Sequence, residues 1–250
     1  MRDCFAVPER RVGNDATAVR EVIDSSDGCE LFTMRLLRTV SGHGIARETA
    51  AADELLFTVA GRGLLICDHR EHALESETGV LLSPGCTYEL VNESGADLTV
   101  VAVSLHAPLR REDRGDAVVS RLSDQAAQTA TADREFRIVF DPDNGCASAT
   151  QFVGYIPVGA APEHFHHYDE VIYILDGNGV MHMNGEHTPL HSGSAIHLPA
   201  REIHTLENSG PDVMRVLGVF RPAGSPAAAF YPDGTPAYTA PERSTPAVAT

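Results

Sequence analysis

The chain has 250 residues, of which 43% are hydrophobic and 22% are charged, a balance typical of one large globular domain or two small ones. Its net charge of −16 argues against a nucleic-acid partner, because a phosphate backbone requires a basic surface, and equally against an anionic membrane surface. A small acidic substrate is not excluded, because a bound metal and one arginine can reverse the field locally.

Cysteine usage and the N-terminus bear on the cellular compartment. The five cysteines form no Cys-x-x-Cys pair and their number is odd, which indicates reduced thiols rather than a disulfide framework. The first residues lack the apolar core of a signal peptide, and no run approaches the roughly 18 apolar residues of a membrane span. We therefore predict a cytoplasmic protein without a membrane partner.

Short strand patterns dominate the first half of the chain. Residues 1–29 are polar and mixed, and they predict an N-terminal arm. Phe32, Met34 and Leu36 then alternate with other residues, which is typical of a strand. Further short strand patterns follow at regular intervals, each ending at a turn, and this spacing favours a sandwich or barrel. We predict that this β unit covers residues 30–106.

Residues 107–136 break the strand pattern and predict a linker. The charged run 109–114 is interpreted as a solvated face, and residues 117–130 could carry a short helix. Strand patterns return over residues 137–221, where Asn184-Gly185 is typical of a two-residue hairpin turn.

The last segment, residues 222–250, is rich in proline and alanine and predicts a tail. Phe230 and Tyr231 could dock this tail on a barrel. The end beyond about Tyr238 is expected to be mobile.

Histidines are concentrated in the second half of the chain. Eight of the 12 lie between His164 and His204. His164, His166 and Glu170 have the same parity along a strand-like segment, so we expect their side chains on one face. Two imidazoles and a carboxylate can hold a divalent first-row metal and leave positions open for substrate or oxygen. A fourth ligand has to come from elsewhere in the fold, and surface or core histidines without metal remain the alternative.

An internal repeat indicates the architecture. Residues separated by 116 positions match in kind at several places: Gly61 and Gly63 with Gly177 and Gly179, Glu54 with Glu170, and Asn92 with Asn208. Two copies of one β unit fit a chain of this length. We therefore predict an all-β protein with two barrels in tandem.

Two motifs carry a family resemblance. One segment of this chain, His164-x-His166-x3-Glu170-x6-Gly177, resembles the first signature motif of the cupin superfamily. A second segment, Gly193-x5-Pro199-x4-His204-x3-Asn208, resembles the second signature motif. Together with the repeat, these motifs make the chain similar to a bicupin, which implies two jelly-roll barrels. The resemblance implies four metal ligands in the C-terminal barrel, namely His164, His166, Glu170 and His204.

The resemblance also implies one divalent first-row transition metal per chain, with Fe(II) or Mn(II) preferred and Ni, Zn or Co as alternatives. The repeat places Glu48, Ala50, Glu54 and Tyr88 at the ligand positions of the first barrel, which predicts a structural barrel without metal. A metal there would require His43 to reach inward.

The implied function is a metal-dependent enzyme for a small organic molecule, with a dioxygenase-type oxidoreductase preferred and Glu170 as a catalytic residue. The alternatives are a non-redox enzyme (isomerase, lyase, cyclase or ureidoglycine-aminohydrolase-like) and a non-catalytic small-molecule-binding bicupin. Candidate substrate or outer residues are Tyr173, His182, His197 and Arg201. Arg201 could receive a substrate carboxylate, although a plain surface arginine is the alternative. Cupins often pair sheets between protomers, so we predict a homodimer, with the strand Leu31–Val40 as the candidate edge.

Overall fold

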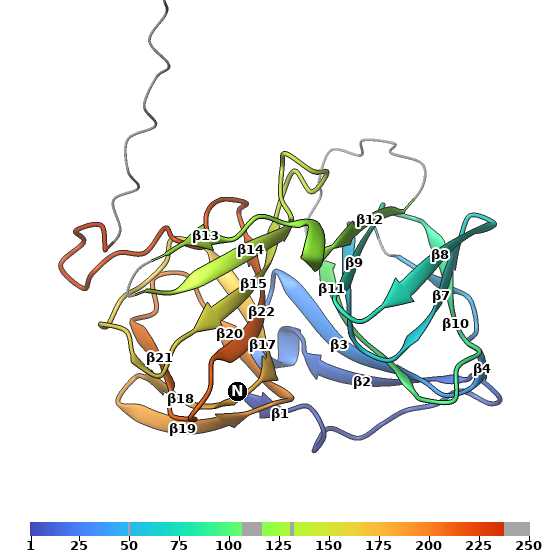
Figure 1. Cartoon of the computed structure of the whole chain (residues 1–250), viewed down its shortest axis with the longest axis horizontal. Coiled ribbons are helices and arrows are strands. Elements are labelled where there is room, and N and C mark those ends of the chain that lie inside the picture. The colour runs from blue at the N-terminus through green and yellow to red at the C-terminus, as the bar shows by residue number, and fades with distance from the viewer. Residues whose placement is uncertain (50, 107–116, 131–132, 238–250) are drawn as a thin grey trace, which may run out of the picture.

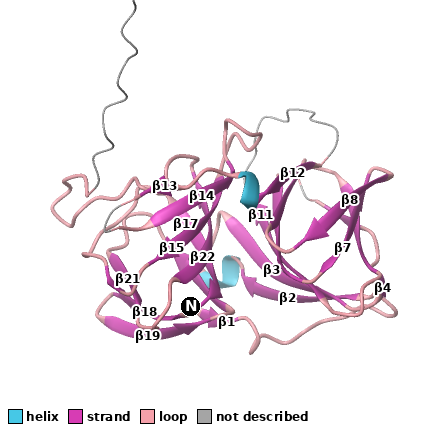
Figure 2. Ribbon diagram, in the orientation of Figure 1, coloured by secondary structure: helices cyan, strands magenta, loops and turns pink. Residues whose placement is uncertain are grey.

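The computed structural model describes residues 1–49, 51–106, 117–130 and 133–237, and these residues form two β barrels side by side (Figures 1 and 2). The charged run 109–114 and the end beyond Tyr238 lie outside the described residues. The described helices are two 3-10 turns, Ser25–Asp27 and Leu122–Asp124, and neither has the length or apolar character of a membrane-spanning helix. The predicted all-β class is confirmed.

The N-terminal barrel is built from two sheets around its own apolar core. Its strands are β2 (Thr17–Ile23), β3 (Phe32–Thr39), β4 (Gly42–His43), β5 (Arg47–Glu48), β6 (Glu54–Ala60), β7 (Arg62–Cys67), β8 (Arg70–Glu75), β9 (Thr78–Leu82), β10 (Thr87–Asn92), β11 (Leu98–Leu105) and β12 (Val118–Arg121). The larger sheet has the order β12-β9-β6-β11-β3-β2, and the smaller one has the order β4-β10-β7-β8 with β5 also beside β10.

The C-terminal barrel repeats this arrangement. Its strands are β1 (Arg2–Asp3), β13 (Gln128–Thr129), β14 (Glu135–Phe140), β15 (Thr150–Ile156), β16 (Gly159–Ala160), β17 (Asp169–Asp176), β18 (Asn178–Met183), β19 (Glu186–His191), β20 (Ser194–Leu198), β21 (His204–Asn208) and β22 (Met214–Arg221). The larger sheet has the order β1-β20-β17-β22-β15-β14-β13, and the smaller one has the order β16-β21-β18-β19.

The two strand orders correspond except for β13 in the C-terminal barrel and β5 in the N-terminal one, and this correspondence is the structural form of the sequence repeat. Strand β9 corresponds to β20, β6 to β17 and β11 to β22. Each larger sheet also contains strands from outside the predicted units 30–106 and 137–221, namely β2 and β12 in the N-terminal barrel and β1 and β13 in the C-terminal barrel. Strand β12, from the segment predicted as a linker, pairs with β9, and β1, from the predicted arm, pairs with β20. The segment 117–130 thus forms β12, a 3-10 turn and β13 instead of an α-helix.

The strand proposed as a dimer edge is not an edge. Strand β3 pairs with β11 on one side and with β2 on the other, so its backbone groups are already used within the chain. The expectation that Leu31–Val40 pairs with a second protomer is therefore wrong. The homodimer itself stays a prediction.

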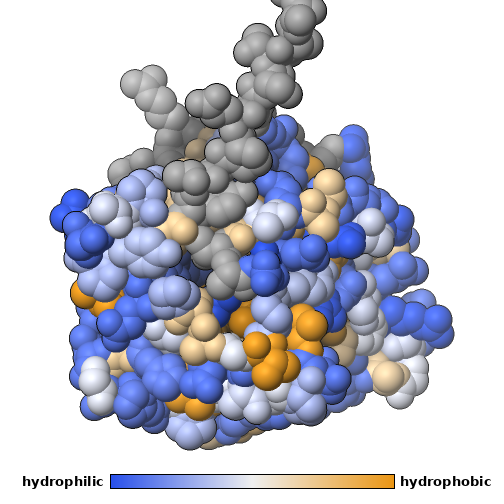
Figure 3. Space-filling view, turned by 60° about the vertical axis from the view of Figure 1, so that its left-hand side comes forward, coloured by the Kyte–Doolittle hydropathy of each residue, from blue (hydrophilic) through white to orange (hydrophobic). Residues whose placement is uncertain are grey.

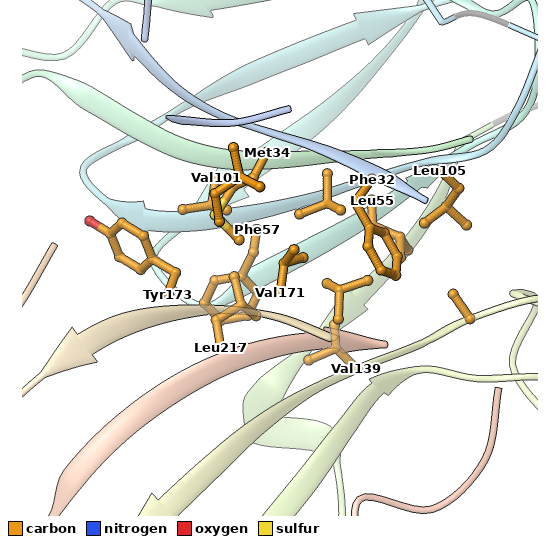
Figure 4. Close-up of a cluster of buried hydrophobic side chains, with 14 of the residues drawn as sticks. Phe32, Met34, Leu55, Phe57, Val101, Leu105, Val139, Val171, Tyr173 and Leu217 are labelled. Atoms are coloured by element: carbon orange, nitrogen blue, oxygen red, sulfur yellow. The ribbon is translucent and has the colours of Figure 1, made fainter. Parts of the chain in front are cut away.

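One apolar core joins the two barrels (Figure 4). Phe57 and Met34 from the N-terminal barrel pack against Val171, Tyr173 and Leu217 from the C-terminal barrel, and all five are almost fully buried. Successive strand side chains alternate between faces, so the odd-numbered residues of β17 enter this shared core while the even-numbered ones enter their own barrel. The sequence pattern could not assign these faces, because both are apolar.

The shared core predicts coupled unfolding. Replacing Phe57, which is fully buried, with alanine should lower the free energy of unfolding by about 3–5 kcal/mol, because a large cavity replaces a buried ring. Denaturant titrations followed by circular dichroism should show one transition moved to lower denaturant. The matched control is Val158→Ala, at a side chain that is 61% exposed, which should leave the midpoint unchanged. Two separated transitions, with only one displaced, would contradict a common core.

The cysteines differ from the expectation of five reduced thiols. Cys67 at the end of β7 and Cys86 before β10 form a disulfide with a sequence separation of 19 residues, while Cys4, Cys29 and Cys146 are buried thiols. The prediction is wrong for the bonded pair, because cysteines without a recognisable spacing were brought together by strand pairing: Cys67 lies opposite Tyr88 in the ladder between β7 and β10. The cytoplasmic location, which was argued partly from reduced thiols, stays a prediction.

Candidate metal centre

Three histidines converge inside the C-terminal barrel. The backbones of His164 and His204 exchange two hydrogen bonds, of 3.1 and 2.9 Å, and their rings lie with centroids 4.5 Å apart. The ring of His166 lies 5.0 Å from that of His164 and 5.3 Å from that of His204. One ligand atom from each of the three residues lies within 4.8 Å of the others. The geometry of this His triad (His164, His166 and His204) therefore fits a single ion.

Hydrogen bonds orient each imidazole of the His triad. The Nδ1 atoms of His164, His166 and His204 lie 2.9 Å from the carbonyl oxygens of Pro162, Ala228 and Glu202, respectively. A carbonyl oxygen only accepts, so each Nδ1 carries the proton and each Nε2 keeps a free lone pair. Within the described part of the chain no hydrogen bond reaches these Nε2 atoms. This is the arrangement that a metal-ligating histidine requires.

Burial keeps the His triad neutral. Desolvation lowers the pKa of His164, and desolvation with the neighbouring imidazoles lowers the pKa of His166 to about 3 and that of His204 to about 4. A metal binds the neutral imidazole and competes with protons for it. All three imidazoles are therefore neutral at neutral pH and available to bind an ion.

Glu170 lies in the same cavity but outside the His triad. Its carboxyl group is buried on β17, and it does not belong to the group of ligand atoms within 4.8 Å. Gly218 on β22 leaves room for it, because a Cβ there would lie 2.7 Å from Oε1 of Glu170 and 2.3 Å from the ring of Phe152. Burial raises the pKa of Glu170 to about 8. The carboxyl is thus positioned beside the His triad and is poised to hold or release a proton near neutral pH.

The raised pKa of Glu170 predicts a pH dependence of stability for the metal-free protein. Folded Glu170 keeps its proton up to about pH 8, whereas the unfolded carboxyl loses it near pH 4.5, so the folded state binds the extra proton between these values and stability falls as pH rises. The histidines act oppositely, but only below their unfolded pKa of 6.5. Thermal melting with a chelator should therefore show a decline from pH 6.5 to 8. The Glu170→Gln variant should lack this decline, and an equal decline in both proteins would contradict the assignment.

A cavity of about 90 Å³ opens beside these side chains. Its wall is mainly apolar, with Phe136, Phe152, Ile172, Leu198 and Leu206 among the lining residues. The C-terminal tail closes part of it, because Pro226 and Ala229 line the cavity and Ala228 supplies the carbonyl for His166. The docking of the tail, expected from Phe230, is confirmed: Phe230 and Phe165 exchange backbone hydrogen bonds and stack their rings 5.7 Å apart.

Two cavity residues were not found from the sequence. Tyr168 stacks between His166, at 4.6 Å, and Phe220, at 3.9 Å, so its ring fixes the plane of one imidazole. Arg134 lines the cavity from the hairpin between β13 and β14. Arg134 belongs to the segment predicted as a linker, and no spacing rule connects either residue with the His triad.

The four candidate substrate or outer residues lie elsewhere. Tyr173 belongs to the core between the barrels. Arg201 is exposed, and its backbone N–H donates to the carbonyl of His166. The Nε2 of His182 lies 2.7 Å from a carboxylate oxygen of Glu207. His197 lies on β20 near Asp169, and none of the four lines the cavity.

The N-terminal barrel has different groups at the equivalent place. Tyr88 donates a hydrogen bond of 3.4 Å to the buried Glu54, and Arg35 lies 3.4 Å from the same carboxylate oxygen. Glu48 is exposed, Ala50 lies outside the described residues, and His43 points to solvent beside Glu89. The other group of potential ligands among the described residues, Cys67, Asp68 and Cys86, contains the disulfide.

Comparisons with known proteins agree with this fold. Residues 151–220 match the cupin domain family model. A segment of 64 residues is 33% identical to an uncharacterized protein of Methanocaldococcus jannaschii, so the match spans 25% of this chain and 51% of that protein.

Solved structures resemble the whole chain at low sequence identity. A putative glyoxylate-induced protein from Pseudomonas aeruginosa is 17% identical with a TM-score of 0.71, and the match covers 84% of this chain and 83% of that one. YlbA from E. coli is 12% identical with a TM-score of 0.72, covering 88% and 89%. An S161A mutant of Bacillus subtilis oxalate decarboxylase is 13% identical with a TM-score of 0.70, covering 93% and 79%. Residues 151–220 of the C-terminal barrel are thus similar to cupin domains, and the chain as a whole has a bicupin fold.

Proposed function

We propose that this bicupin is a metal-dependent enzyme that binds one divalent first-row transition metal ion and acts on a small organic molecule. The observation that carries the proposal is the hydrogen bonding of the His triad, in which three carbonyl oxygens hold the protons on Nδ1 and leave three Nε2 lone pairs. A storage or packing role would not require three neutral, oriented imidazoles beside a cavity. Mixed imidazole and carboxylate surroundings suit Fe(II), Mn(II), Ni(II), Zn(II) or Co(II).

In this proposal the His triad supplies three ligands, and Glu170 supplies the fourth or acts as a proton carrier next to them. The ion would serve as a Lewis acid toward substrate oxygen atoms and, if redox-active, as an activator of dioxygen. The apolar wall would exclude water from the substrate, which strengthens every charge interaction inside the cavity. Tyr168 would keep the ring of His166 in place by stacking against it.

The preferred reaction is a dioxygenase-type oxidation, because three histidines leave adjacent open positions on the ion for substrate and oxygen. The second candidate is a non-redox reaction such as isomerisation or decarboxylation. The pKa of Glu170, about 8, favours this alternative, since a general acid or base works best near the operating pH. One protein of similar fold is an oxalate decarboxylase, which provides a precedent for decarboxylation on this fold.

The proposal is tested by metal analysis followed by an activity screen. Protein prepared without metal should bind one equivalent of Fe(II), Mn(II) or Zn(II) per chain. An oxygen electrode then compares the Fe(II) form with the Zn(II) form over a panel of small organic acids, enols and amides. Oxygen uptake by the Fe(II) form alone supports the dioxygenase-type reaction. Turnover by both forms without oxygen supports the non-redox reaction. If the protein binds none of these ions, the proposal is wrong.

The tail contact predicts a smaller effect on metal binding. Replacing Phe230 with alanine should weaken metal affinity by about tenfold, because the tail that carries the carbonyl partner of His166 loses its ring stacking. The control is Tyr231→Ala, whose ring makes no aromatic contact with the described residues. Competition with a chelating dye measures both affinities. Equal affinities for the two variants would show that the tail does not position His166.

A further inference from the structure

Arg134 brings a positive charge into the cavity. Arg134 lines the cavity together with the His triad and Glu170, and one of its guanidinium nitrogens donates a 2.5 Å hydrogen bond to the carbonyl oxygen of Leu206. A guanidinium has five N–H donors in a rigid plane, so this bond uses only one of them. Besides burial, the charge of Arg134 contributes to the lowered pKa of all three imidazoles, which indicates that the guanidinium lies near the His triad.

No carboxylate in the described part of the chain pairs with the charge of Arg134. Among the described residues Arg134 forms no ion pair, although other arginines such as Arg38 and Arg47 do. Burial lowers the pKa of Arg134 to about 10, and burial is the cause of that shift, with no acidic neighbour opposing it. The carboxyl of Glu170 shares the cavity, but its raised pKa likewise reflects burial alone, so the two groups do not pair. Burying a charge without a partner is costly, and proteins usually supply a partner.

We propose that Arg134 binds the carboxylate of the substrate, so that the substrate class of this site is small organic monocarboxylates that carry a second oxygen donor for the metal. This inference rests on the proposed metal-dependent function, whose chemistry it specifies. A guanidinium recognises a carboxylate through two parallel hydrogen bonds, which fixes the orientation of the ligand as well as its charge.

Charge and size both limit the ligand. The face shown in Figure 3 is mostly hydrophilic with a few hydrophobic residues, and the chain carries a net charge of −16. An anion is therefore repelled at long range and needs a local positive site. Arg134 and a divalent ion together outweigh the single carboxyl of Glu170. The cavity of about 90 Å³ and its apolar wall leave room for only a small hydrocarbon part.

Arg201 does not fill this role, because it is exposed and does not line the cavity. It therefore provides a matched control, as an arginine on the same barrel whose loss removes the same formal charge. A difference between variants at the two positions reports the cavity charge and not the net charge of the chain.

The test uses lactate, which has a carboxylate, a hydroxyl and one methyl group, and its neutral counterpart lactamide. Isothermal titration calorimetry compares wild type, Arg134→Gln, Arg134→Lys and Arg201→Gln, each loaded with Zn(II) and with its zinc content measured. We expect Arg134→Gln to weaken lactate binding by about tenfold or more while leaving lactamide binding unchanged, because a charge-assisted hydrogen bond is lost. Arg134→Lys should keep part of the lactate affinity, and Arg201→Gln should match wild type.

The outcomes separate the two proposals. If Arg134→Gln holds one zinc and binds lactate as tightly as wild type, or if wild type fails to bind lactate, the inference about Arg134 is overturned and the metal proposal stands. If no variant holds zinc, the metal proposal fails. The same titration on metal-free protein then decides the inference, because the guanidinium is charged with or without the ion. Loss of lactate binding in metal-free Arg134→Gln alone supports it, and equal binding in all four proteins overturns it.

Discussion

Metal content in the His166→Ala variant is expected to fall from one ion per chain to near zero. Each imidazole of the His triad supplies one of three neutral nitrogen ligands, and two nitrogens that remain in a cavity with an apolar wall hold a divalent ion poorly. Loss of an outer partner of a ligand already costs about 10–100-fold in affinity, so loss of the ligand itself should cost more. Elemental analysis after dialysis against metal-free buffer measures the effect, and His204→Ala should behave in the same way.

His191→Ala is the matched control for both histidine variants. His191 is exposed at the end of β19, where its Nε2 lies 4.0 Å from a carboxylate oxygen of Asp3 and its Nδ1 lies 2.9 Å from the carbonyl oxygen of Ser192. It should retain the full metal content. If His166→Ala and His204→Ala also keep one tightly bound ion, the site lies elsewhere. Two ions per chain in wild type would instead show that the N-terminal barrel binds metal.

Turnover by the Glu170→Gln variant is expected to drop by about 100-fold or more, while a substantial part of the metal remains bound. General acid–base catalysis by a positioned carboxyl contributes about 10²–10⁴-fold, and glutamine keeps the shape of the side chain but cannot exchange a proton. Because Glu170 lies outside the His triad, the three imidazoles remain in place in this variant. Activity and metal content are measured on the same preparation, once a substrate is known.

The pattern of these two measurements separates the roles of Glu170. If the variant keeps its metal but loses turnover, and excess metal does not restore turnover, the carboxyl of Glu170 acts as a proton carrier. If metal and turnover are lost in parallel, the carboxyl of Glu170 is a fourth ligand that moves onto the ion when the ion binds. Full activity per bound metal would remove Glu170 from the mechanism. The swap is sterically mild, because Gln fills the space that Gly218 leaves beside the carboxyl.

The sequence by itself determined the architecture of this protein and the core of its candidate site. Alternation of apolar residues, short strands and regular turns are local properties of the chain, so they predicted an all-β fold without tertiary information. The repeat at 116 positions predicted two equivalent barrels, and the strand orders of the two barrels correspond apart from β5 and β13. Parity along a strand predicted that His164 and His166 share one face, and the resemblance to the cupin motifs implied that His204 joins them; the three ligand atoms lie within 4.8 Å of one another.

Only the tertiary structure decided what surrounds the His triad. The carbonyl of Ala228, the ring of Tyr168 and the guanidinium of Arg134 come from a tail, a loop and a predicted linker, and no periodicity in those segments marks them as part of the site. Tyr173 is a sequence candidate that the structure places outside the site. It lies on the same strand as Glu170 but at an odd-numbered position, so its side chain faces the core shared with the other barrel. Burial is also a tertiary property: it neutralises the imidazoles and raises the pKa of Glu170, and both shifts require a cavity that exists only after folding.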